Sequence, residues 1–169
     1  MANSEDVITL LTRQHRELEA LLRSLMDAEH GVERATSLAQ VADELAVHLG
    51  AEEAVFYPAV RARRTEDILL ESLEEHLSLK RLVTDLMALS PTDTTWMPKC
   101  KVLQEQTEHH HKEEEEHLFP KVLKLHDPAE RATLGSEVQA HEDALRYRGS
   151  PRYALAGQTE AAEPLSGPV

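Results

Sequence analysis

The sequence has little of several residue types, and each shortage excludes a class of structure. Its 169 residues include one cysteine, Cys100, so the chain can form neither an internal disulfide nor a metal site made of several thiolates. Glycine is limited to six residues and aromatic residues to 4%, whereas leucine, alanine and glutamate recur at helical spacing. This composition favours an all-α chain. Any metal that the protein binds must then be held by nitrogen and oxygen ligands.

The sequence also lacks long apolar runs and an excess of positive charge. No stretch approaches the roughly 18 consecutive apolar residues of a membrane-spanning helix, and the acidic start MANSEDVITLL has no secretory-signal pattern. We therefore expect a cytoplasmic protein with no membrane partner. The 31 acidic and 18 basic residues give a formal net charge of −13. Because this charge repels phosphate groups, we expect no nucleic-acid partner.

Periodic apolar residues divide the chain into five predicted helices. The expected ranges are about 4–30, 33–63, 65–89, 95–125 and 127–147, of which the last is the shortest. Since the connections are short, the first four should form an up-down-up-down four-helix bundle over residues 1–126, with the helix at 127–147 as an addition. Residues 148–169 are rich in Gly, Pro and small side chains, and we expect them to form a mobile tail.

Each of the first four predicted helices has a histidine within its apolar stripe, and two of these histidines are followed one turn later by a glutamate. The six residues are His15, His48, Glu52, His76, His110 and Glu114. Residues four apart lie on one face of a helix, so each His-x-x-x-Glu pair should point into the core. A buried histidine alone usually makes only hydrogen bonds. Two buried carboxylates, however, need a positive partner, and a bound metal would satisfy all six groups.

An internal repeat supports this ligand set. Segment 110–122 repeats segment 48–60 with a constant offset of 62 residues, and His76 follows His15 by 61 residues. The chain therefore consists of two copies of a helix pair, each with one His and then His-x-x-x-Glu. Two halves related by a pseudo-twofold axis would place six ligands between them. Six ligands suit a pair of metal ions bridged by carboxylates better than a single ion.

The segment HHHKEEEEH, which begins at His109, allows three registers of His-x-x-x-Glu. Only His110 and Glu114 have the same spacing to the following proline as the pair in the first half, so we assign these two as ligands. His109, His111 and His117 are then neighbours of the site, groups that contact the ligands, or an exposed charged face. We expect substitution of His109 or His111 to change the metal content little.

Pro58 and Pro120 lie inside predicted helices at equivalent positions. Each removes a backbone hydrogen bond and should kink its helix just beyond the ligands. Tyr57, directly before Pro58, can either bring a hydroxyl near the site or serve only in packing.

These residues and spacings resemble the hemerythrin-like, or HHE cation-binding, domain family. The resemblance covers residues 4–125 and rests on the histidines above and on the doubled His-x-x-x-Glu-Glu signature, which leads to Phe-Tyr-Pro at 56–58 and Leu-Phe-Pro at 118–120. It implies the hemerythrin bundle and an oxo- or hydroxo-bridged pair of iron ions, with manganese or zinc as second choices. One departure is Lys80, which stands where oxygen-carrying hemerythrins have another histidine.

The resemblance to family members with four His and two Glu ligands implies chemistry with a small diatomic molecule or peroxide. We expect the protein to bind or react with O2, NO or H2O2, with catalase-like or oxidase activity if it is an enzyme. The alternative is an iron donor, buffer or sensor for iron homeostasis or iron–sulfur repair, without turnover. An electron donor protein or an iron acceptor protein would be the respective partner. A zinc protease is not expected, because the chain has no H-E-x-x-H pattern.

Overall fold

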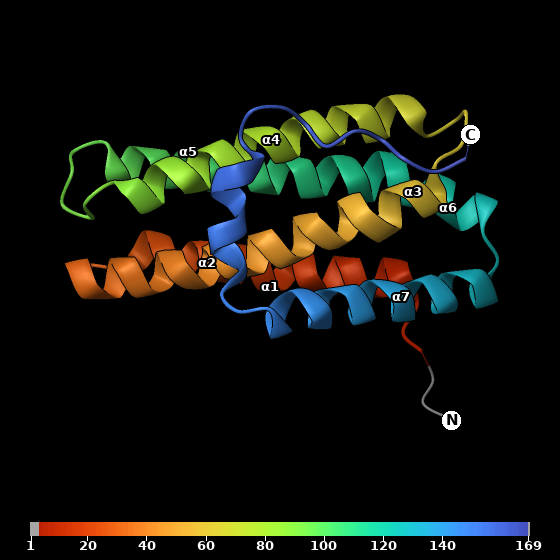
Figure 1. Ribbon diagram of the computed structural model, residues 1–169, viewed down its shortest axis with the longest axis horizontal. Coiled ribbons are helices and arrows are strands. Elements are labelled where there is room, and N and C mark those ends of the chain that lie inside the picture. Colours follow the sequence, from red (N-terminus) through yellow and green to blue (C-terminus); the bar gives the residue numbers. More distant parts are fainter. Residues whose placement is uncertain (1–3, 169) are drawn as a thin grey trace.

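The computed structural model describes residues 4–168, and these form helices and connecting segments without any strand. The bundle consists of α1 (Val7–Asp27), α2 (Gly31–Ala51) with its continuation α3 (Tyr57–Val60), α4 (Glu66–Ala88), and α5 (Trp96–Glu113) with its continuation α6 (Phe119–Leu125). The helices alternate in direction, and α7 (Pro128–Tyr147) lies along α1 and α2 outside the bundle (Figure 1). The predicted all-α, up-down-up-down bundle with a fifth helix is confirmed.

Aspartate side chains fix the start of the first and the last α-helix. Asp6 accepts a hydrogen bond from the backbone N–H of Ile8 at 2.9 Å. Asp127 accepts from the N–H groups of Ala129 and Glu130, while the Glu130 carboxylate accepts from the N–H of Asp127 at 2.8 Å. This reciprocal capping explains why α7 begins at Pro128, one residue after the start of the predicted range.

Both helices that carry a His-x-x-x-Glu pair contain a π-helical turn that ends two residues before their proline. The turns are η1 (Glu52–Phe56) and η2 (Glu114–Leu118), and each begins at a predicted ligand. The N–H groups of residues 57 and 119 reach back five residues, to the carbonyl oxygens of Glu52 and Glu114. Within an α-helix, a proline ring clashes with the carbonyl four residues earlier, and a wider turn relieves this clash. Pro58 and Pro120, which were expected to kink their helices, are therefore accompanied by two equivalent π turns.

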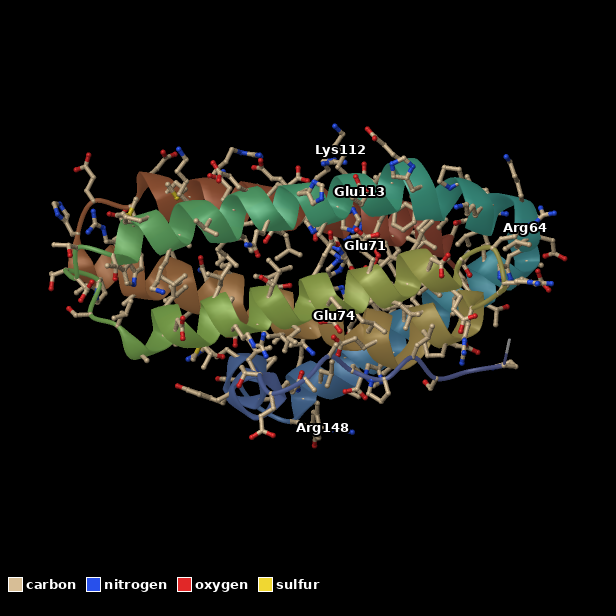
Figure 2. The ribbon with its side chains drawn as sticks, turned by 90° about the horizontal axis from the view of Figure 1, so that it is seen from above. Arg64, Glu71, Glu74, Lys112, Glu113 and Arg148 are labelled. Carbon is tan, nitrogen blue, oxygen red and sulfur yellow. The ribbon has the colours of Figure 1, made fainter. Side chains whose placement is uncertain are left out.

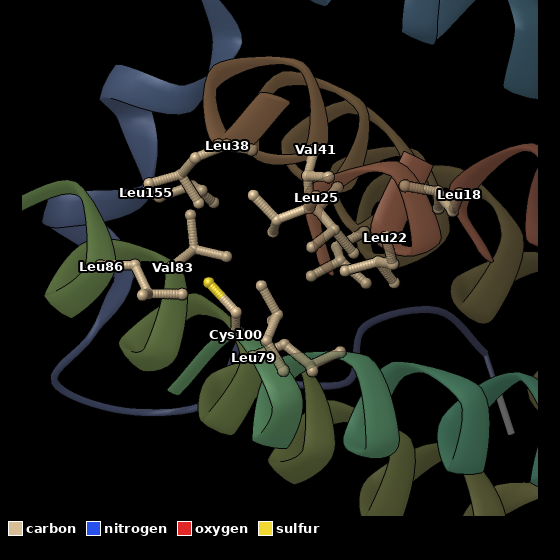
Figure 3. Packing of buried hydrophobic residues seen from close by; sticks show 14 of the residues in the cluster. Leu18, Leu22, Leu25, Leu38, Val41, Leu79, Val83, Leu86, Cys100 and Leu155 are labelled. Carbon is tan, nitrogen blue, oxygen red and sulfur yellow. The ribbon is translucent and has the colours of Figure 1, made fainter. Parts of the chain in front are cut away.

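Two apolar clusters fill the bundle on either side of the predicted ligands. The loop-end cluster includes Leu22, Leu25, Val41, Leu86, Trp96 and Cys100 (Figure 3). The proline-end cluster includes Leu11, Phe56, Tyr57, Leu69, Phe119 and Val122. Full burial of one such side chain contributes roughly 1.5–3 kcal/mol to folding. The polar centre is thus held between two packed apolar layers.

The C-terminal segment packs on the bundle, which differs from the expected mobile tail. Residues 151–158 form a 3-10 helix, η3 (Pro151–Gln158), that contacts α2 and α4. Leu155 is 2% exposed and points into the loop-end cluster (Figure 3). Beyond η3, Arg81 donates hydrogen bonds to the carbonyl oxygens of Thr159 and Glu160 at 2.8 and 3.1 Å. The Gly- and Pro-rich composition correctly excludes a long helix, but it does not reveal that one leucine fills a gap between α2 and α4.

Charged side chains cover the outside of the bundle. Lys112 points outward from α5, and Glu71 and Glu74 lie on the exposed face of α4 (Figure 2). Within residues 4–168, none of the helices is both long and apolar enough to cross a membrane.

Candidate metal centre

The structure brings all six predicted ligands together in the middle of the bundle. His15 comes from α1, His76 from α4, and the two His-Glu pairs from the ends of α2 and α5, where the π turns begin. Each of the six side chains is at most 3% exposed. Their ligand atoms form two groups, and the atoms of each group lie within 4.8 Å of one another. The groups are His15, His48, Glu52 and Glu114, and Glu52, His76 and His110.

Hydrogen bonds at Nδ1 fix the orientation of the two histidines that precede the His-Glu pairs. Nδ1 of His15 donates to Glu115 at 2.8 Å, and Nδ1 of His76 donates to Glu53 at 3.0 Å. Lys80, 3% exposed, donates to the same Glu53 carboxylate at 2.8 Å and does not replace a histidine ligand. A carboxylate at Nδ1 leaves Nε2 free to bind a metal, and this arrangement is common around metal-binding histidines.

The histidines of the two His-Glu pairs are held in different ways. Nδ1 of His110 donates to the Glu75 carboxylate at 2.7 Å. Nδ1 of His48 donates instead to the amide oxygen of Gln14 at 3.0 Å. The Gln14 amide nitrogen in turn donates to both oxygens of Glu142, on α7, at 2.8 and 3.0 Å. At Nδ1 of His48, the Gln14 amide therefore stands between the imidazole and the Glu142 carboxylate.

A cavity of about 670 Å³ lies beside this chain of hydrogen bonds, between α1, α2 and α7. Its lining includes Gln14, His48 and Glu142. Burial raises the pKa of Glu142 to about 7 against the opposing effect of Gln14. Glu142 could not be predicted as a functional residue, because α7 lies outside the internal repeat.

Several buried polar atoms at the centre have no hydrogen-bond partner among residues 4–168. They are Nε2 of His15, His48 and His111, both carboxylate oxygens of Glu52, and Oε2 of Glu114. Nε2 of His15 lies 3.2 Å from Glu114, and Nε2 of His48 lies 3.2 Å from Glu52, without hydrogen-bond geometry. An unsatisfied buried carboxylate costs several kcal/mol, and bound cations would offset that cost. The donor set therefore fits metal ions that prefer imidazole and carboxylate ligands.

Burial and neighbouring charges change the imidazole pKa values in opposite directions. Burial lowers the pKa of His48 to about 3, so this imidazole is neutral and can bind a metal. Burial also acts against the charged form of His110, but the Glu114 and Glu52 carboxylates outweigh it and raise the pKa of His110 to about 10. In the metal-free chain, a protonated His110 therefore compensates the carboxylates. A bound cation would replace that proton.

Tyr57, whose role the sequence left open, places its hydroxyl at the centre. The hydroxyl donates to Oε1 of Glu114 at 2.8 Å and lies 3.0 Å from Nε2 of His76. Burial, followed by the Glu114 and Glu52 carboxylates, raises the pKa of Tyr57 well above its ordinary value. The phenol therefore remains protonated and is a hydrogen-bond donor at the site.

The three remaining histidines of the HHHKEEEEH segment do not share one environment. His109 and His117 have side chains that are 63% and 54% exposed, which agrees with a charged outer face. His111 is 1% exposed and one of its ring nitrogens lies within 4.8 Å of ligand atoms of His15 and His48. The repeat did not reveal His111, because Leu49 stands at the equivalent position of the first half. His111 lies four residues after Thr107, which is buried, so the two residues share one face of the helix. This spacing was the signal that could have indicated an inward-facing His111.

The chain belongs to the hemerythrin HHE cation-binding domain family, since residues 6–121 match that family. The solved structures include a similar one, a hemerythrin HHE cation binding domain-containing protein from Mycobacterium kansasii. It has a TM-score of 0.76 and 22% sequence identity, over 92% of this chain and 95% of that one. This likeness confirms the hemerythrin-like fold.

A curated relative is a protein named DNA nickase from Nostoc sp. (strain PCC 7120 / SAG 25.82 / UTEX 2576). It is 25% identical to this chain over 160 residues, which are 95% of this chain and 43% of the relative. The chain therefore spans less than half the length of that protein.

Proposed function

We propose that the protein is a non-haem di-iron protein that reacts with small oxygen species, with hydrogen peroxide as the favoured reactant over O2 or NO. The observation that carries this proposal is the set of inward-facing imidazole nitrogens and carboxylate oxygens that lack partners among the described residues. Two groups of ligand atoms that share Glu52 suit two ions with a bridging carboxylate. Iron is favoured over manganese and zinc because of the family resemblance.

The surroundings of the site favour a small reactant and the movement of protons. All six ligands are at most 3% exposed, which favours a small reactant over a large substrate. When bound, the iron pair would supply the two electrons that are exchanged with peroxide. One H2O2 molecule takes up two electrons and two protons to give two waters, and a second loses two of each to give O2. The Tyr57 hydroxyl can hold and return a proton beside Glu114.

Two other functions are less well supported by these observations. Delivery of iron to an acceptor protein would require the release of ions from ligands that are almost completely buried. Nicking of DNA, by analogy with the name of the Nostoc relative, would require contact with phosphates, which the net charge of −13 opposes.

The test is the addition of hydrogen peroxide to protein that has been loaded with iron, with dissolved oxygen recorded by an electrode. We expect sustained release of about one O2 for each two H2O2 consumed, over many peroxide molecules per chain. The variant His110→Ala should lose this activity, and the exposed neighbour His109→Ala should retain it. A single oxidation that stops after about one peroxide per site would contradict turnover.

A further inference from the structure

Glu142 is a buried carboxylate in the lining of the cavity between α1, α2 and α7. It is 2% exposed, and it lies beyond residues 6–121, which match the family. Both of its oxygens accept hydrogen bonds from a single donor, Nε2 of Gln14, at 2.8 and 3.0 Å. Because a buried carboxylate costs free energy unless donors satisfy it, a glutamate at this position indicates a role beyond packing.

Close packing of α7 holds Glu142 against the bundle. At Gly135, on α7, a Cβ atom would overlap the backbone oxygen of Glu5, so a glycine is needed for this approach to the start of α1. At Gly50, on α2, a Cβ atom would lie 3.1 Å from Cδ1 of Leu145. Two glycines therefore allow α7 to lie close to α1 and α2, on either side of Glu142 along the helix.

The chemistry of the partners fixes the direction of each hydrogen bond between Glu142 and His48. An ionised carboxylate can only accept, so Gln14 must turn its NH2 group toward Glu142. The amide oxygen of Gln14 then faces Nδ1 of His48 at 3.0 Å, and this oxygen can also only accept. His48 must therefore carry its proton on Nδ1, which leaves the lone pair of Nε2 for a metal ion.

A second carboxylate favours the opposite tautomer of His48. Oε1 of Glu52 lies 3.2 Å from Nε2 of His48. A proton on Nε2 would suit that carboxylate, but it would prevent this nitrogen from binding a metal. A neutral imidazole has one proton for its two nitrogens, so the two carboxylates compete for it from opposite ends of the ring. Glu142, through the Gln14 amide, favours the tautomer that can bind a metal.

We infer that Glu142 is a positioning residue for the metal centre: it orients the Gln14 amide, and this amide sets the tautomer of His48. The inference rests on the proposed function only in taking His48 as a metal ligand. In the other half, Glu75 of α4 contacts His110 directly, and no amide stands between them. The additional helix α7 thus supplies, from outside the bundle, the carboxylate that α4 supplies within it.

The first measurement uses metal-free protein with 15N-labelled histidine at about pH 8, where most of Glu142 is ionised. Long-range 1H–15N spectra show which ring nitrogen carries the proton, and the variant His48→Ala identifies the signals of His48. We expect the proton on Nδ1 in the wild type and mainly on Nε2 in Glu142→Gln, because an amide at position 142 can donate to Gln14 and let it turn. Glu137→Gln, an exposed position of the same helix, should behave as the wild type does.

The second measurement is the affinity for ferrous iron, loaded without oxygen and competed with a chelator. Glu142→Gln should bind one ion about tenfold more weakly than the wild type. The double variant Gln14→Glu with Glu142→Gln places an acceptor-only carboxylate directly at Nδ1 of His48. It should therefore return the proton to Nδ1 and recover the affinity.

The two measurements separate this inference from the di-iron proposal. If Glu142→Gln keeps the proton of His48 on Nδ1, or binds iron as tightly as a wild type that holds two ions, the inference is wrong while the di-iron proposal stands. If the wild type binds no iron but the tautomers change as expected, the di-iron proposal fails and the control of the His48 tautomer by Glu142 stands.

Discussion

The two halves of the bundle share one backbone frame but surround the centre with different side chains. In each half, the histidine on the first helix donates a hydrogen bond to a glutamate of the other half. His15 donates to Glu115, the residue after the predicted ligand Glu114. His76 donates to Glu53, the residue after the predicted ligand Glu52. The halves differ at the partner of the next histidine. Glu75 contacts His110 directly, whereas its counterpart Gln14, 61 residues earlier, contacts His48.

Further differences fall at equivalent positions of the lining. Tyr57 corresponds to Phe119, and Leu49 corresponds to His111. As a result, one side has a third imidazole and an apolar ring, and the other side has a phenol hydroxyl. A duplicated backbone can thus surround the two sides of one centre with different chemistry. The repeated backbone places the six predicted ligands, whereas single residues that differ between the halves determine which side chains contact them.

The largest predicted contrast between the halves concerns the metal-free protein. His110→Ala removes the protonated imidazole that compensates Glu52 and Glu114, so it should lower the free energy of unfolding by about 3 kcal/mol or more near pH 7. His48→Ala removes a neutral imidazole and should cost clearly less, although it should also abolish tight binding of at least one ion. Urea unfolding after removal of metal measures the difference. Equal losses for the two variants would show that the charge assignment is wrong.

The second contrast is between Gln14, which contacts His48, and Glu75, which contacts His110. The variant Gln14→Glu tests it. Gln14→Glu gives this side the residue type of Glu75, but it also faces Glu142, so two carboxylates would meet without a donor between them. We expect a loss of roughly 1–3 kcal/mol at pH 8. Adding Glu142→Gln should recover most of that loss, because an amide then donates to the new carboxylate. The interaction energy comes from urea unfolding of both single variants and the double variant, and an additive result would contradict the coupling.

Tyr57→Phe makes the two sides alike at this position. Loss of the hydrogen bond to Glu114 should lower stability by about 1 kcal/mol, while the iron content stays the same. The rate of oxygen release from peroxide should fall, since the proton-holding hydroxyl is removed. A variant with lower iron content and an unchanged rate per iron would assign Tyr57 to metal retention instead.

Glu142→Gln should have the smallest effect, and the effect should depend on pH. Burial raises the pKa of Glu142 from its ordinary value of 4.5 to about 7, so its stabilising contribution is complete below about pH 4.5 and is lost as the pH rises through 7. The variant should therefore gain stability relative to the wild type between pH 5 and pH 8. We expect roughly 1 kcal/mol, because the adjacent cavity partly screens the carboxylate. A difference that is constant over this range, measured by thermal unfolding, would argue against an elevated pKa.

Sequence periodicity was sufficient to predict the bundle and to select six residues that the structure brings together. The constant offset between the two His-x-x-x-Glu segments identified His110 over its two neighbours, because a repeat conserves the face of a helix. The same argument could not find His111, which has no histidine counterpart. Glu142 and Leu155 lie outside the repeat, and their positions depend on how α7 and η3 pack against the bundle. Contacts of that kind are set by tertiary packing, which local patterns do not encode.

The most direct test of the account is the number of iron ions per chain, measured by mass spectrometry after anaerobic loading and removal of excess metal. The account predicts about two irons per chain in the wild type and in His109→Ala, and at most about one in His48→Ala. Wild-type protein that retains no iron, or only a substoichiometric amount of another metal such as zinc, would contradict the central claim that the buried imidazoles and carboxylates hold a pair of iron ions.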